Sequence, residues 1–373
     1  MTDLLVTTHT PVLRSGQGVR TYGVARALAA NGGLTLLYAS FGAEQPDPAF
    51  RAIAGVDLHE ALPSRGGRRV LAYAGARLRG VPAGFARGVS RELSAAAAAL
   101  AAVPGRTRIV ADGPIAAAAL GGVARRRPVI YNAHNLESSF RHELDQGRRQ
   151  WGSLGSFERA LLASSAESWM VSEADMVAAR ELCPQATLRY VPNVVDTAAI
   201  VPVTPAKDAR RALFVASFHY EPNRIGLRFL LDDVFPLVWS QLPEANLAIA
   251  GAGLEQRTFT DRRVRALGFV EDLRDVYADA SCAVVPLLQG GGSPLKFVEA
   301  LAFGLPVIAT PRAAGGLHVR DGEHCLIADG PEAFAAALVG VLRDGAGQIA
   351  IQGRALVERE YSIDALSAIL APT

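Results

Sequence analysis

Lysine is almost absent from this chain of 373 residues. Of its 38 basic residues only two are lysines, Lys207 and Lys296, and the rest are arginines. A position that keeps lysine in such a chain is a candidate for a role that needs a compact ammonium group and not a planar guanidinium. A large excess of charge of either sign is also missing, because the formal net charge is +2. A charge this small argues against a protein dedicated to nucleic acids.

Cysteines and long hydrophobic runs are scarce as well. The three cysteines, Cys183, Cys282 and Cys325, lie far apart without metal-ligand spacing, which predicts buried thiols in a reducing compartment. The longest apolar run, residues 93–103, has about half the length that a bilayer requires. No basic stretch followed by a hydrophobic one opens the sequence, so no secretory signal is expected. These features predict a soluble, cytoplasmic protein.

Short runs rich in leucine and β-branched residues alternate with longer segments of helical periodicity. The first expected strands are 3–8, 34–40, 107–113, 128–134 and 167–172. After a proline-rich stretch the pattern starts again, at 212–218, 245–253, 263–269, 282–288, 306–311 and 325–329. Such alternation predicts parallel sheets covered by helices on both faces. The predicted fold class is α/β, with two facing, doubly wound, Rossmann-like domains and a cleft between them.

The length also favours two domains, since roughly 150 residues per domain is usual. We expect an amino-terminal domain over 1–195, a carboxy-terminal domain over 196–355, and a final helix over 356–373 that packs back on the first domain. Ligands of open α/β sheets bind at the carboxyl ends of the strands. Functional residues are therefore expected in the loops that follow the strands.

The loop GGGSP, residues 290–294, leads into a predicted helix that Gly304 ends. A helix N-terminus offers free N–H groups and the positive end of its dipole, and glycines let an anion approach the backbone. Lys296 lies in the first turn and Glu299 shares its face. Together they could bind a phosphate and a sugar hydroxyl. The alternative is an ordinary glycine loop beside a surface Lys–Glu pair.

Three further loops follow expected strands. Gly16 and Gly18 could offer backbone amides to an anion or simply form a turn. His134 could be functional or only structural, and with Glu137 it makes no metal site because a third ligand is missing. Arg224 could reach a phosphate or lie in a solvent-facing turn.

Arginines gather in one part of the chain. Nine of them lie between residues 61 and 111, against a single acid, Glu92. The segment 61–91 could form a surface for an anionic membrane or an acidic acceptor. The alternative is a solvated helix in a chain that uses arginine throughout.

Taken in order, these motifs resemble those of the family-4 retaining glycosyltransferases, which have the GT-B fold. The family's glycine loop and first helix are similar to SGQGVRTYGVARALAANG, and its interdomain segment to YVPNVVDT. Elements of its donor domain are similar to LAIAGAG, LGFVED and LKFVEALAFGLPVIAT. The resemblance runs nearly end to end. It implies that the first domain binds an acceptor and the second a nucleotide sugar.

The resemblance also implies roles for individual residues. Glu299 would hold the ribose. His134 matches a histidine that lies near the donor sugar in the family, and His134 and Lys296 would be the catalytic residues. The diphosphate would be held by the backbone of Gly292, Ser293, Pro294 and Leu295, together with Gly16 and Gly18.

Two departures from the family pattern change the expected donor site. Gly291 stands where the family usually has a first glutamate, so the sugar would be unusual, such as a deoxy sugar, or be held by the backbone of 290–292. Ser217 stands where an arginine is usual, and the lysine that follows it is missing too. Lys296, alone or together with Arg224, would then supply the positive charge for the phosphates.

The implied reaction is sugar transfer with retention at the anomeric carbon and without a metal ion or other cofactor. The partners would be a nucleotide sugar and a glycan, lipid or natural-product acceptor, with no nucleic acid; the oligomeric state is left open. The protein would work in a bacterial cytoplasm, with a peripheral membrane contact through 61–91 as one option. Two alternatives stay open: a catalytically silent nucleotide-sugar-binding subunit, and a GT-B epimerase that acts on a nucleotide sugar.

Overall fold

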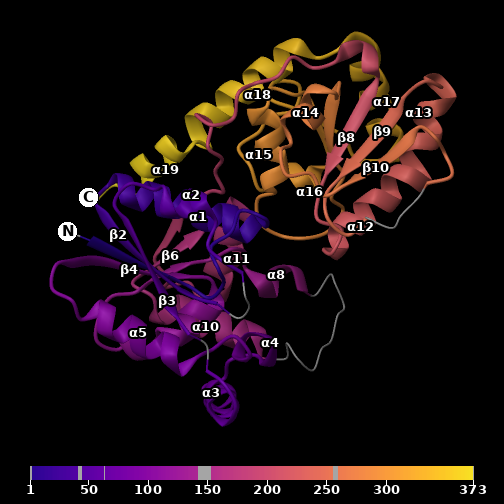
Figure 1. The fold of residues 1–373 in the computed structure, drawn as a ribbon. Coiled ribbons are helices and arrows are strands. Elements are labelled where there is room, and N and C mark those ends of the chain that lie inside the picture. The colour runs from indigo at the N-terminus through magenta and orange to yellow at the C-terminus, as the bar shows by residue number, and fades with distance from the viewer. Residues whose placement is uncertain (1, 41–43, 63, 142–152, 255–258, 373) are drawn as a thin grey trace. The chain divides into compact units, whose positions relative to one another are not determined.

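The computed structural model describes residues 2–40, 44–62, 64–141, 153–254 and 259–372. It divides the chain into two compact units (Figure 1). The amino-terminal unit comprises Met1–Asn193 and Leu366–Thr373, and the carboxy-terminal unit comprises Val194–Ala365. From the sequence, the first and second domains are expected to end at residues 195 and 355. The observed divisions follow residues 193 and 365, so the first lies close to the expected position and the second ten residues after it (365 against 355).

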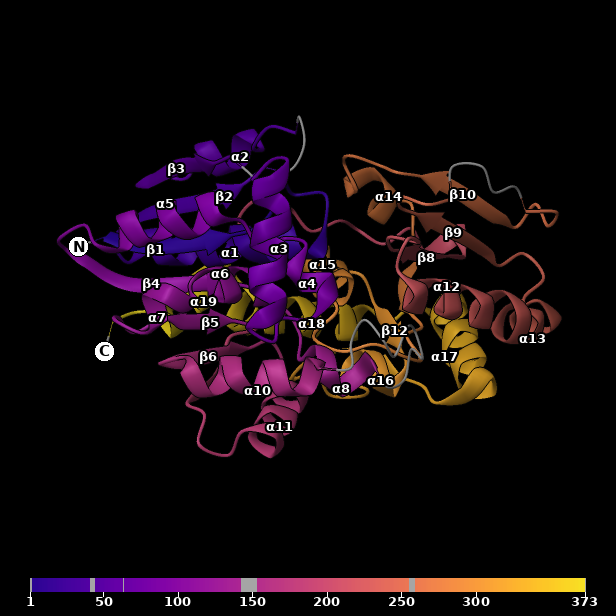
Figure 2. The same ribbon diagram turned by 90° about the horizontal axis from the view of Figure 1, so that it is seen from below.

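The amino-terminal unit is built on a seven-stranded parallel sheet in the order β3-β2-β1-β4-β5-β6-β7. Figure 2 shows β3 to β6 following one another in this order. The strands are β1 (Thr2–Thr7), β2 (Gly33–Ala39), β3 (Val56–Ala61), β4 (Arg106–Asp112), β5 (Ile130–Asn132), β6 (Glu167–Met170) and β7 (Leu188–Tyr190). The inner strands β1 and β2 are buried along nearly their whole length, because helices cover both faces of a parallel sheet.

Helices flank this sheet on both sides. Figures 1 and 2 show α1 and α19 on one face and α5 and α10 on the other. The helices of the unit are α1 (Gly16–Ala30), α2 (Pro48–Arg51), α3 (Gly67–Leu78), α4 (Ala83–Ala86), α5 (Arg91–Ala101), α6 (Pro114–Ala119), α7 (Gly121–Ala124), α8 (Glu137–Arg141), α10 (Leu154–Ser164) and α11 (Glu173–Leu182). Leu93 and Ala97 of α5 share one buried cluster with Val6 of β1 and Ile109 of β4. This cluster fixes the carboxyl ends of the central strands, where the polar residues described below lie.

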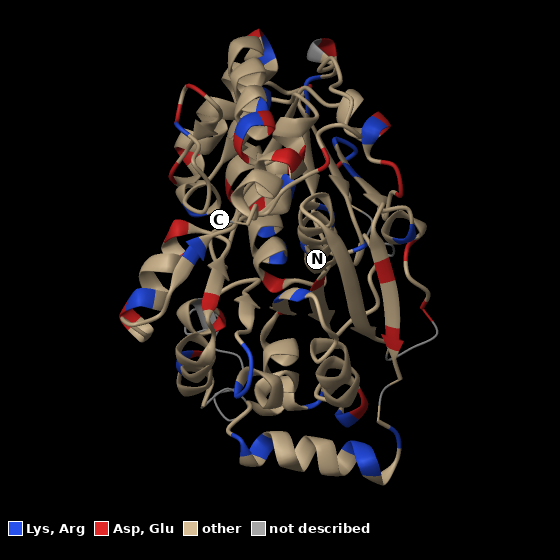
Figure 3. Cartoon of the chain, turned by 90° about the vertical axis from the view of Figure 1, so that its left-hand side faces the viewer, with Lys and Arg blue, Asp and Glu red and all other residues tan. Residues whose placement is uncertain are grey.

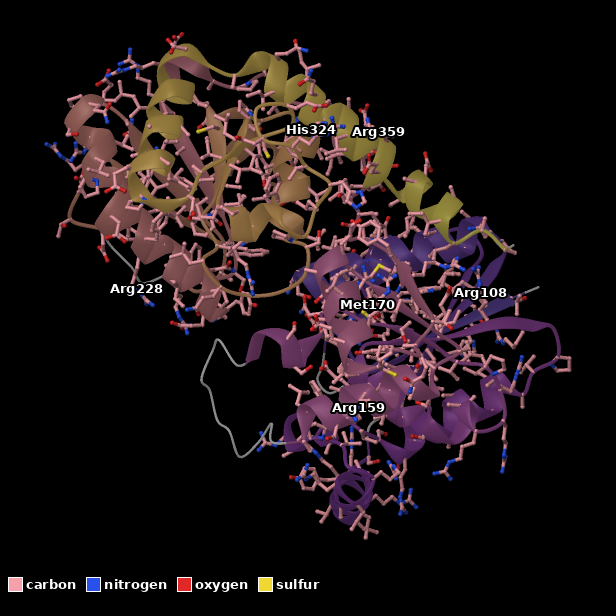
Figure 4. The ribbon with its side chains drawn as sticks, turned by 180° about the vertical axis from the view of Figure 1, so that it is seen from behind. Arg108, Arg159, Met170, Arg228, His324 and Arg359 are labelled. Carbon is pink, nitrogen blue, oxygen red and sulfur yellow. The ribbon has the colours of Figure 1, made fainter. Side chains whose placement is uncertain are left out.

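The chain end joins the amino-terminal unit through hydrogen bonds to its last helix, α19 (Ile363–Ile369). Asn31 Nδ2 donates to the carbonyl of Ser367 at 2.8 Å, and Arg189 Nη1 donates to that of Ile369 at 3.1 Å. Arg108, labelled in Figure 4, donates to the carbonyl of Leu370 and forms a 2.6 Å ion pair with Asp3. These bonds satisfy carbonyls at the C-terminal end of the helix, where guanidinium groups are favourable.

The carboxy-terminal unit contains a six-stranded parallel sheet in the order β10-β9-β8-β11-β12-β13. Its strands are β8 (Arg211–Val215), β9 (Asn246–Ala250), β10 (Val264–Gly268), β11 (Cys282–Val285), β12 (Val307–Ala309) and β13 (Leu326–Ile327). Its helices are η1 (Lys207–Ala209), α12 (Glu221–Arg228), the π-helical η2 (Phe229–Val234), α13 (Phe235–Gln241), α14 (Arg274–Ala278), α15 (Leu295–Ala302), α16 (Pro311–Ala314), α17 (Gly330–Asp344) and α18 (Gly347–Glu360). Alternate residues of β8 enter different cores: Phe214 packs in one buried cluster and Leu213 in the other.

The predicted α/β fold with two parallel sheets is confirmed, and two strands were missed. No strand was predicted over 56–61 or 188–190, where β3 and β7 form the two edges of the first sheet. Both are partly exposed and carry polar residues, so they lack the continuous hydrophobic run of the inner strands.

The prediction of buried thiols is confirmed for Cys183, Cys282 and Cys325, which are all free and buried. Burial raises the pKa of Cys282 far above its usual range and that of Cys325 to about 12, which keeps both thiols protonated. In the part of the chain that the structure describes, no single helix is long and apolar enough to cross a membrane. Among the described helices, α17 and α18 are the only two that pass that test as a pair, and the bend between them is 105°.

Glu158 of α10 caps the short helix α8. Its fully buried carboxylate accepts hydrogen bonds from the amides of Glu137 at 2.7 Å and Ser138 at 2.9 Å. Burial raises the pKa of Glu158 to about 7, although these hydrogen bonds oppose the shift.

We therefore expect Glu158→Gln to flatten part of the pH dependence of stability. Between about pH 4.5 and 7 the folded wild type binds a proton that the unfolded chain has lost, so the contribution is complete below that range and disappears as the pH rises through 7. The wild-type free energy of unfolding should lose about 3 kcal/mol across this range relative to the variant. Urea titrations at several pH values measure the difference, with Glu181→Gln on exposed surface as the control. Parallel profiles for the wild type and Glu158→Gln would contradict this expectation.

Candidate functional site

Two loops of the carboxy-terminal unit bring the predicted residues to one edge of its sheet. One loop follows β8 and the other follows β11, and these strands are paired in parallel. Their carboxyl ends therefore meet at the same edge. In the second loop Gly290 and Gly292 have φ values of 108° and 76°, which side-chain-bearing residues rarely adopt. The turn that leads into α15 thus depends on its glycines, whereas Gly291 between them is exposed.

Lys296 of α15 contacts the first loop directly. Its ammonium group donates a hydrogen bond to Oδ1 of Asn223, and Nδ2 of Asn223 donates to the carbonyl of Ser217 at 2.7 Å. The Lys296 Nζ also lies 5.3 Å from the centroid of the Phe214 ring, within cation–π range. The structure thus joins Lys296 and Ser217 through Asn223, a residue that the predicted site omitted. Its signal was the Tyr-x-Pro-Asn pattern at 220–223, which departs from the family's usual Arg and Lys.

Burial sets the protonation of both titratable groups of α15. It lowers the pKa of Lys296 to about 7. It raises the pKa of Glu299 to about 7, and a hydrogen bond of 3.2 Å from the Tyr277 hydroxyl to Oε2 of Glu299 partly offsets this. Both groups therefore change charge near neutral pH. An anion placed beside Lys296 would favour its charged form, and Glu299 has an oxygen suited to a hydroxyl group.

The low pKa of Lys296 can be measured directly, because the chain has only one other lysine. Competitive labelling with acetic anhydride, followed by mass spectrometry, should show half-maximal reactivity of Lys296 near pH 7. In urea, where its surroundings are lost, the same lysine should titrate near its ordinary pKa of about 10.4. If the folded and unfolded profiles coincide, Lys296 does not have the buried environment described here.

The start of α15 contains the remaining predicted residues of this unit. Pro294 occupies the position before the helix and provides no side-chain cap, and Ser293 before it is buried. In the first turn the amide of Phe297 donates to the carbonyl of Pro294 at 2.9 Å, whereas the amides of Leu295 and Lys296 precede the first intrahelical hydrogen bonds, as at any helix N-terminus. An anion could bind there.

Arg224 is engaged with its own helix. Its Nε lies 2.7 Å from Oε2 of Glu221, and its Nη1 donates to the carbonyl of Phe218 at 3.2 Å. The guanidinium therefore already has a carboxylate partner. A contact between Arg224 and phosphate, which would have to replace Glu221, stays a prediction.

In the amino-terminal unit, His134 follows β5 and pairs with Asp112 at the end of β4. His134 Nε2 lies 2.8 Å from Oδ1 of Asp112, and the imidazole retains 16% of its surface while Asp112 is buried. Burial would raise the pKa of Asp112, but the charges of His134 and His9 and several hydrogen bonds hold it well below its usual range. The aspartate is therefore ionised and fixes the orientation of His134, leaving Nδ1 for another partner.

Asp112 is the centre of a buried polar network that the sequence did not predict. It accepts hydrogen bonds from Thr21 Oγ1 at 2.6 Å and Asn132 Nδ2 at 2.7 Å. Arg20 donates to Oδ1 of Asn132 at 2.6 Å and to the carbonyl of Val191 at 3.0 Å. Burial lowers the pKa of Arg20 to about 10, a change that Asp112 opposes.

A signal for this network exists in α1. Arg20 lies four and eight residues before Val24 and Leu28, which are both buried, so it shares their face of the helix. A charged residue on a buried helix face needs partners in the interior. The sequence shows this need but does not name Asp112 or Asn132 as the partners.

Gly16 and Gly18 lie at the start of α1. The Gly18 amide donates to the side chain of Ser15, the N-cap, at 3.1 Å. A Cβ atom on Gly18 would lie 1.7 Å from the carbonyl oxygen of Val12. Close backbone packing thus explains the glycine at 18, and the predicted contact of Gly16 and Gly18 with a diphosphate stays a prediction.

Each of the two units holds a parallel, Rossmann-like sheet with candidate functional residues at strand ends, which is the arrangement of the GT-B fold. Residues 209–344 match the model of the family Glycosyl transferases group 1. The match covers only the carboxy-terminal unit, within Val194–Ala365, and includes Lys296 and Glu299.

Curated relatives match shorter segments. A phosphatidyl-myo-inositol mannosyltransferase of Mycobacterium leprae is 34% identical over 136 residues, which cover 34% of this chain and 36% of that protein. An uncharacterized 44.6 kDa protein from the cps region of Klebsiella pneumoniae is 26% identical over 163 residues, which cover 40% of this chain and 42% of that protein. Each alignment therefore spans less than half of the relative's length.

Solved structures share the fold over the whole chain. Sucrose-phosphate synthase from Thermosynechococcus elongatus has a TM-score of 0.76 at 19% identity, covering 99% of this chain and 96% of that one. Anabaena HepE, solved with UDP and glucose, has a TM-score of 0.67 at 13% identity, covering 98% and 97%. WaaG, a glycosyltransferase involved in lipopolysaccharide biosynthesis, has 0.64 at 13% identity, covering 99% and 100%. At these identities the likeness establishes the GT-B fold.

Proposed function

We propose that this protein transfers a sugar from a nucleoside-diphosphate donor to a hydroxyl group of an acceptor, with retention at the anomeric carbon. The observation that carries the proposal is the cluster of Lys296, Asn223 and Ser217 beside Glu299, at strand ends of the unit that matches the glycosyltransferase family. A HepE structure with UDP-glucose and the mannosyltransferase relative support a nucleotide-sugar donor.

In this proposal the diphosphate lies at the N-terminus of α15. Backbone amides of Gly292, Ser293 and Leu295 and the ammonium group of Lys296 meet its charge, while Pro294 between them has no N–H to donate, and Glu299 accepts a hydrogen bond from a ribose hydroxyl. A preorganised set of donors stabilises the charge that develops on the leaving diphosphate, which lowers the barrier to transfer. In this proposal protein groups alone stabilise the charge of the leaving diphosphate, and the reaction needs no metal ion.

The proton balance of Lys296 follows from its low pKa. Lys296 must be charged to bind phosphate, yet above pH 7 it is mostly neutral without ligand. Binding above pH 7 should therefore take up a proton, and donor affinity should fall as the pH rises.

The amino-terminal unit has the second set of roles. His134, oriented by Asp112, is proposed to contact the donor sugar, and the acceptor is proposed to bind this unit. No described residue is placed as a covalent nucleophile in the proposal. The leaving phosphate would instead help to take the proton of the acceptor hydroxyl on the same face of the sugar.

Gly291 makes the sugar-binding end of the site different from the usual family pattern. A glycine has no side chain to bind the outer hydroxyls of a hexose, so a sugar with fewer hydroxyls, such as a deoxy sugar, is favoured.

We also propose that the protein works in the cytoplasm, at the inner face of the membrane.

A panel of nucleotides tests the donor site. Ligands that bind only the folded protein raise its melting temperature by mass action. We expect one of UDP, GDP, ADP or dTDP to raise it well above the others. Failure of all four would overturn the proposed site.

Product analysis tests the reaction itself. The nucleotide sugar of the selected base is incubated with the protein, and hydrolysis or transfer is followed by NMR of the anomeric proton. Release of a sugar with the donor's configuration supports retention. Binding without turnover would instead identify a silent binding subunit, and an isomerised nucleotide sugar would identify an epimerase.

A further inference from the structure

Helix α3 presents apolar side chains to solvent as well as to the protein. On its inner side Ala72 and Ala76 are buried. On its outer side Val70, Leu71 and Leu78 are exposed by 66%, 56% and 90%. Leu78 is thus almost fully in contact with solvent, which is unusual for a large apolar residue in a helix that already packs one face on the protein.

These exposed residues form one stripe. Successive residues of an α-helix are about 100° apart, which puts Val70, Ala74, Leu78 and Leu71 within about 100° of one another, opposite Ala72 and Ala76. By the same geometry Arg77 borders the stripe on one side and Arg68 on the other. An apolar stripe edged by long cationic side chains is the arrangement of helices that lie in a membrane interface.

The segment that contains α3 carries charge of one sign. The segment 61–91, in which residue 63 lies outside the described residues, has seven arginines and no acid. Figure 3 shows the helix at the lower edge with basic positions and no acidic one. Glu92 beside the segment is 3.9 Å from Arg68 and also accepts a hydrogen bond from Ser90 at 3.1 Å. The surface therefore keeps a strong positive excess.

We propose that α3 docks on an anionic lipid surface, with Val70, Leu71 and Leu78 inserted between headgroups and the arginines bound to lipid phosphates. This partner accounts for both the charge and the apolar stripe. A second copy of the chain would bring the same positive charges together, and a soluble polyanion would leave Leu78 in water. The proposal does not rest on glycosyl transfer, because it concerns a surface of the amino-terminal unit alone.

Cosedimentation of the full chain with vesicles tests the proposal. Without nucleotide or sugar, binding should be at least tenfold tighter to phosphatidylcholine containing 30% phosphatidylglycerol than to phosphatidylcholine alone, and should weaken strongly in 0.5 M salt. Equal binding to both vesicles, or no binding to either at low salt, would overturn it. Lys296→Ala should bind the vesicles as the wild type does, which separates this result from the fate of the donor site.

Paired variants separate charge from insertion. Each arginine near an anionic surface contributes about a fivefold gain in affinity. Arg68→Ala/Arg77→Ala, which removes the two arginines that border the stripe, should therefore weaken binding by about 25-fold, whereas Arg125→Ala/Arg126→Ala, exposed in the same unit, should have little effect.

Leu78→Asp should weaken binding at least tenfold, compared with Val177→Asp at another exposed apolar position of the unit. The emission of a Leu78→Trp variant should shift to the blue when anionic vesicles are added. If Leu78→Asp binds like the wild type while the arginine variant does not, the apolar stripe does not insert and the proposed docking is wrong. If each control weakens binding as much as its partner variant, α3 is not the docking surface.

Discussion

Replacing Lys296 with alanine should lower kcat/KM for the donor by about 100- to 1,000-fold, the usual loss when one donor to a developing anion is removed. The affinity for the nucleoside diphosphate should fall by about 10- to 150-fold, because a hydrogen bond to a charged group contributes about 1.5–3 kcal/mol. Lys296 is the only lysine in the described site. Arg224 cannot easily replace its charge, because the Arg224 guanidinium is already paired with Glu221. Calorimetric titration with the nucleotide selected by the thermal panel gives the affinity.

Lys296→Arg and Lys207→Ala complete this experiment. A planar guanidinium should restore little affinity, because the contacts with Asn223 and Phe214 are made by a compact ammonium group. Lys207→Ala removes the same charge elsewhere in the unit and should leave affinity unchanged. The wild type should also lose affinity as the pH rises above 7, where Lys296 must gain a proton to bind, and Lys296→Ala should lack this dependence. Unchanged affinity of Lys296→Ala would refute the role of Lys296 in donor binding.

The second large effect is expected for Asp112→Asn. Asparagine provides one acceptor oxygen and turns an NH2 group toward donors such as Thr21 and Asn132, so at least one hydrogen bond is lost. The change also removes the negative charge that opposes the low pKa of Arg20. Breaking a buried charge network of this kind costs about 3–5 kcal/mol.

Hydrogen exchange of the full chain measures this loss unit by unit. Amides of β1 and β4 should exchange more than 100-fold faster in Asp112→Asn, since about 3 kcal/mol corresponds to a factor of that size, while those of β8 and β9 should be unaffected. Asp57→Asn serves as the control, because its partner His59 is an exposed surface group. Equal protection of β1 and β4 in Asp112→Asn and the wild type would show that the network does not stabilise the unit.

The inner strands of both sheets were predictable to within a few residues. Strands such as β1 and β9 are buried on both faces, so each is a continuous hydrophobic run in the sequence. The edge strands β3 and β7 were missed because only one side of an edge strand pairs with a neighbour, and polar residues such as Asp57 and Glu60 are tolerated there.

The candidate site was predictable where it depends on local order along the chain. The glycine turn, the helix that follows it and the spacing of Lys296 and Glu299 are all local features, and the rule that strand ends carry function placed them together with Ser217. The bond from Lys296 to Asn223 was not predictable, because it joins residues 73 positions apart whose distance depends on how β8 and β11 pair.

The sequence by itself determined the alternation of strands and helices, the two parallel sheets, the buried cysteines and the glycine-to-helix turn that carries the rare lysine. Only the tertiary structure decided which polar groups share the interior. Strand β4 lies beside β1, and helix α1, which follows β1 in the chain, packs across both strands. This packing brings Arg20 and Thr21 of α1 to Asp112, although Thr21 and Asp112 are 91 residues apart in the sequence. Periodicity shows that a buried charge needs a partner, but hydrogen bonds form between groups that are close in space, and that proximity is set by the packing of the whole unit.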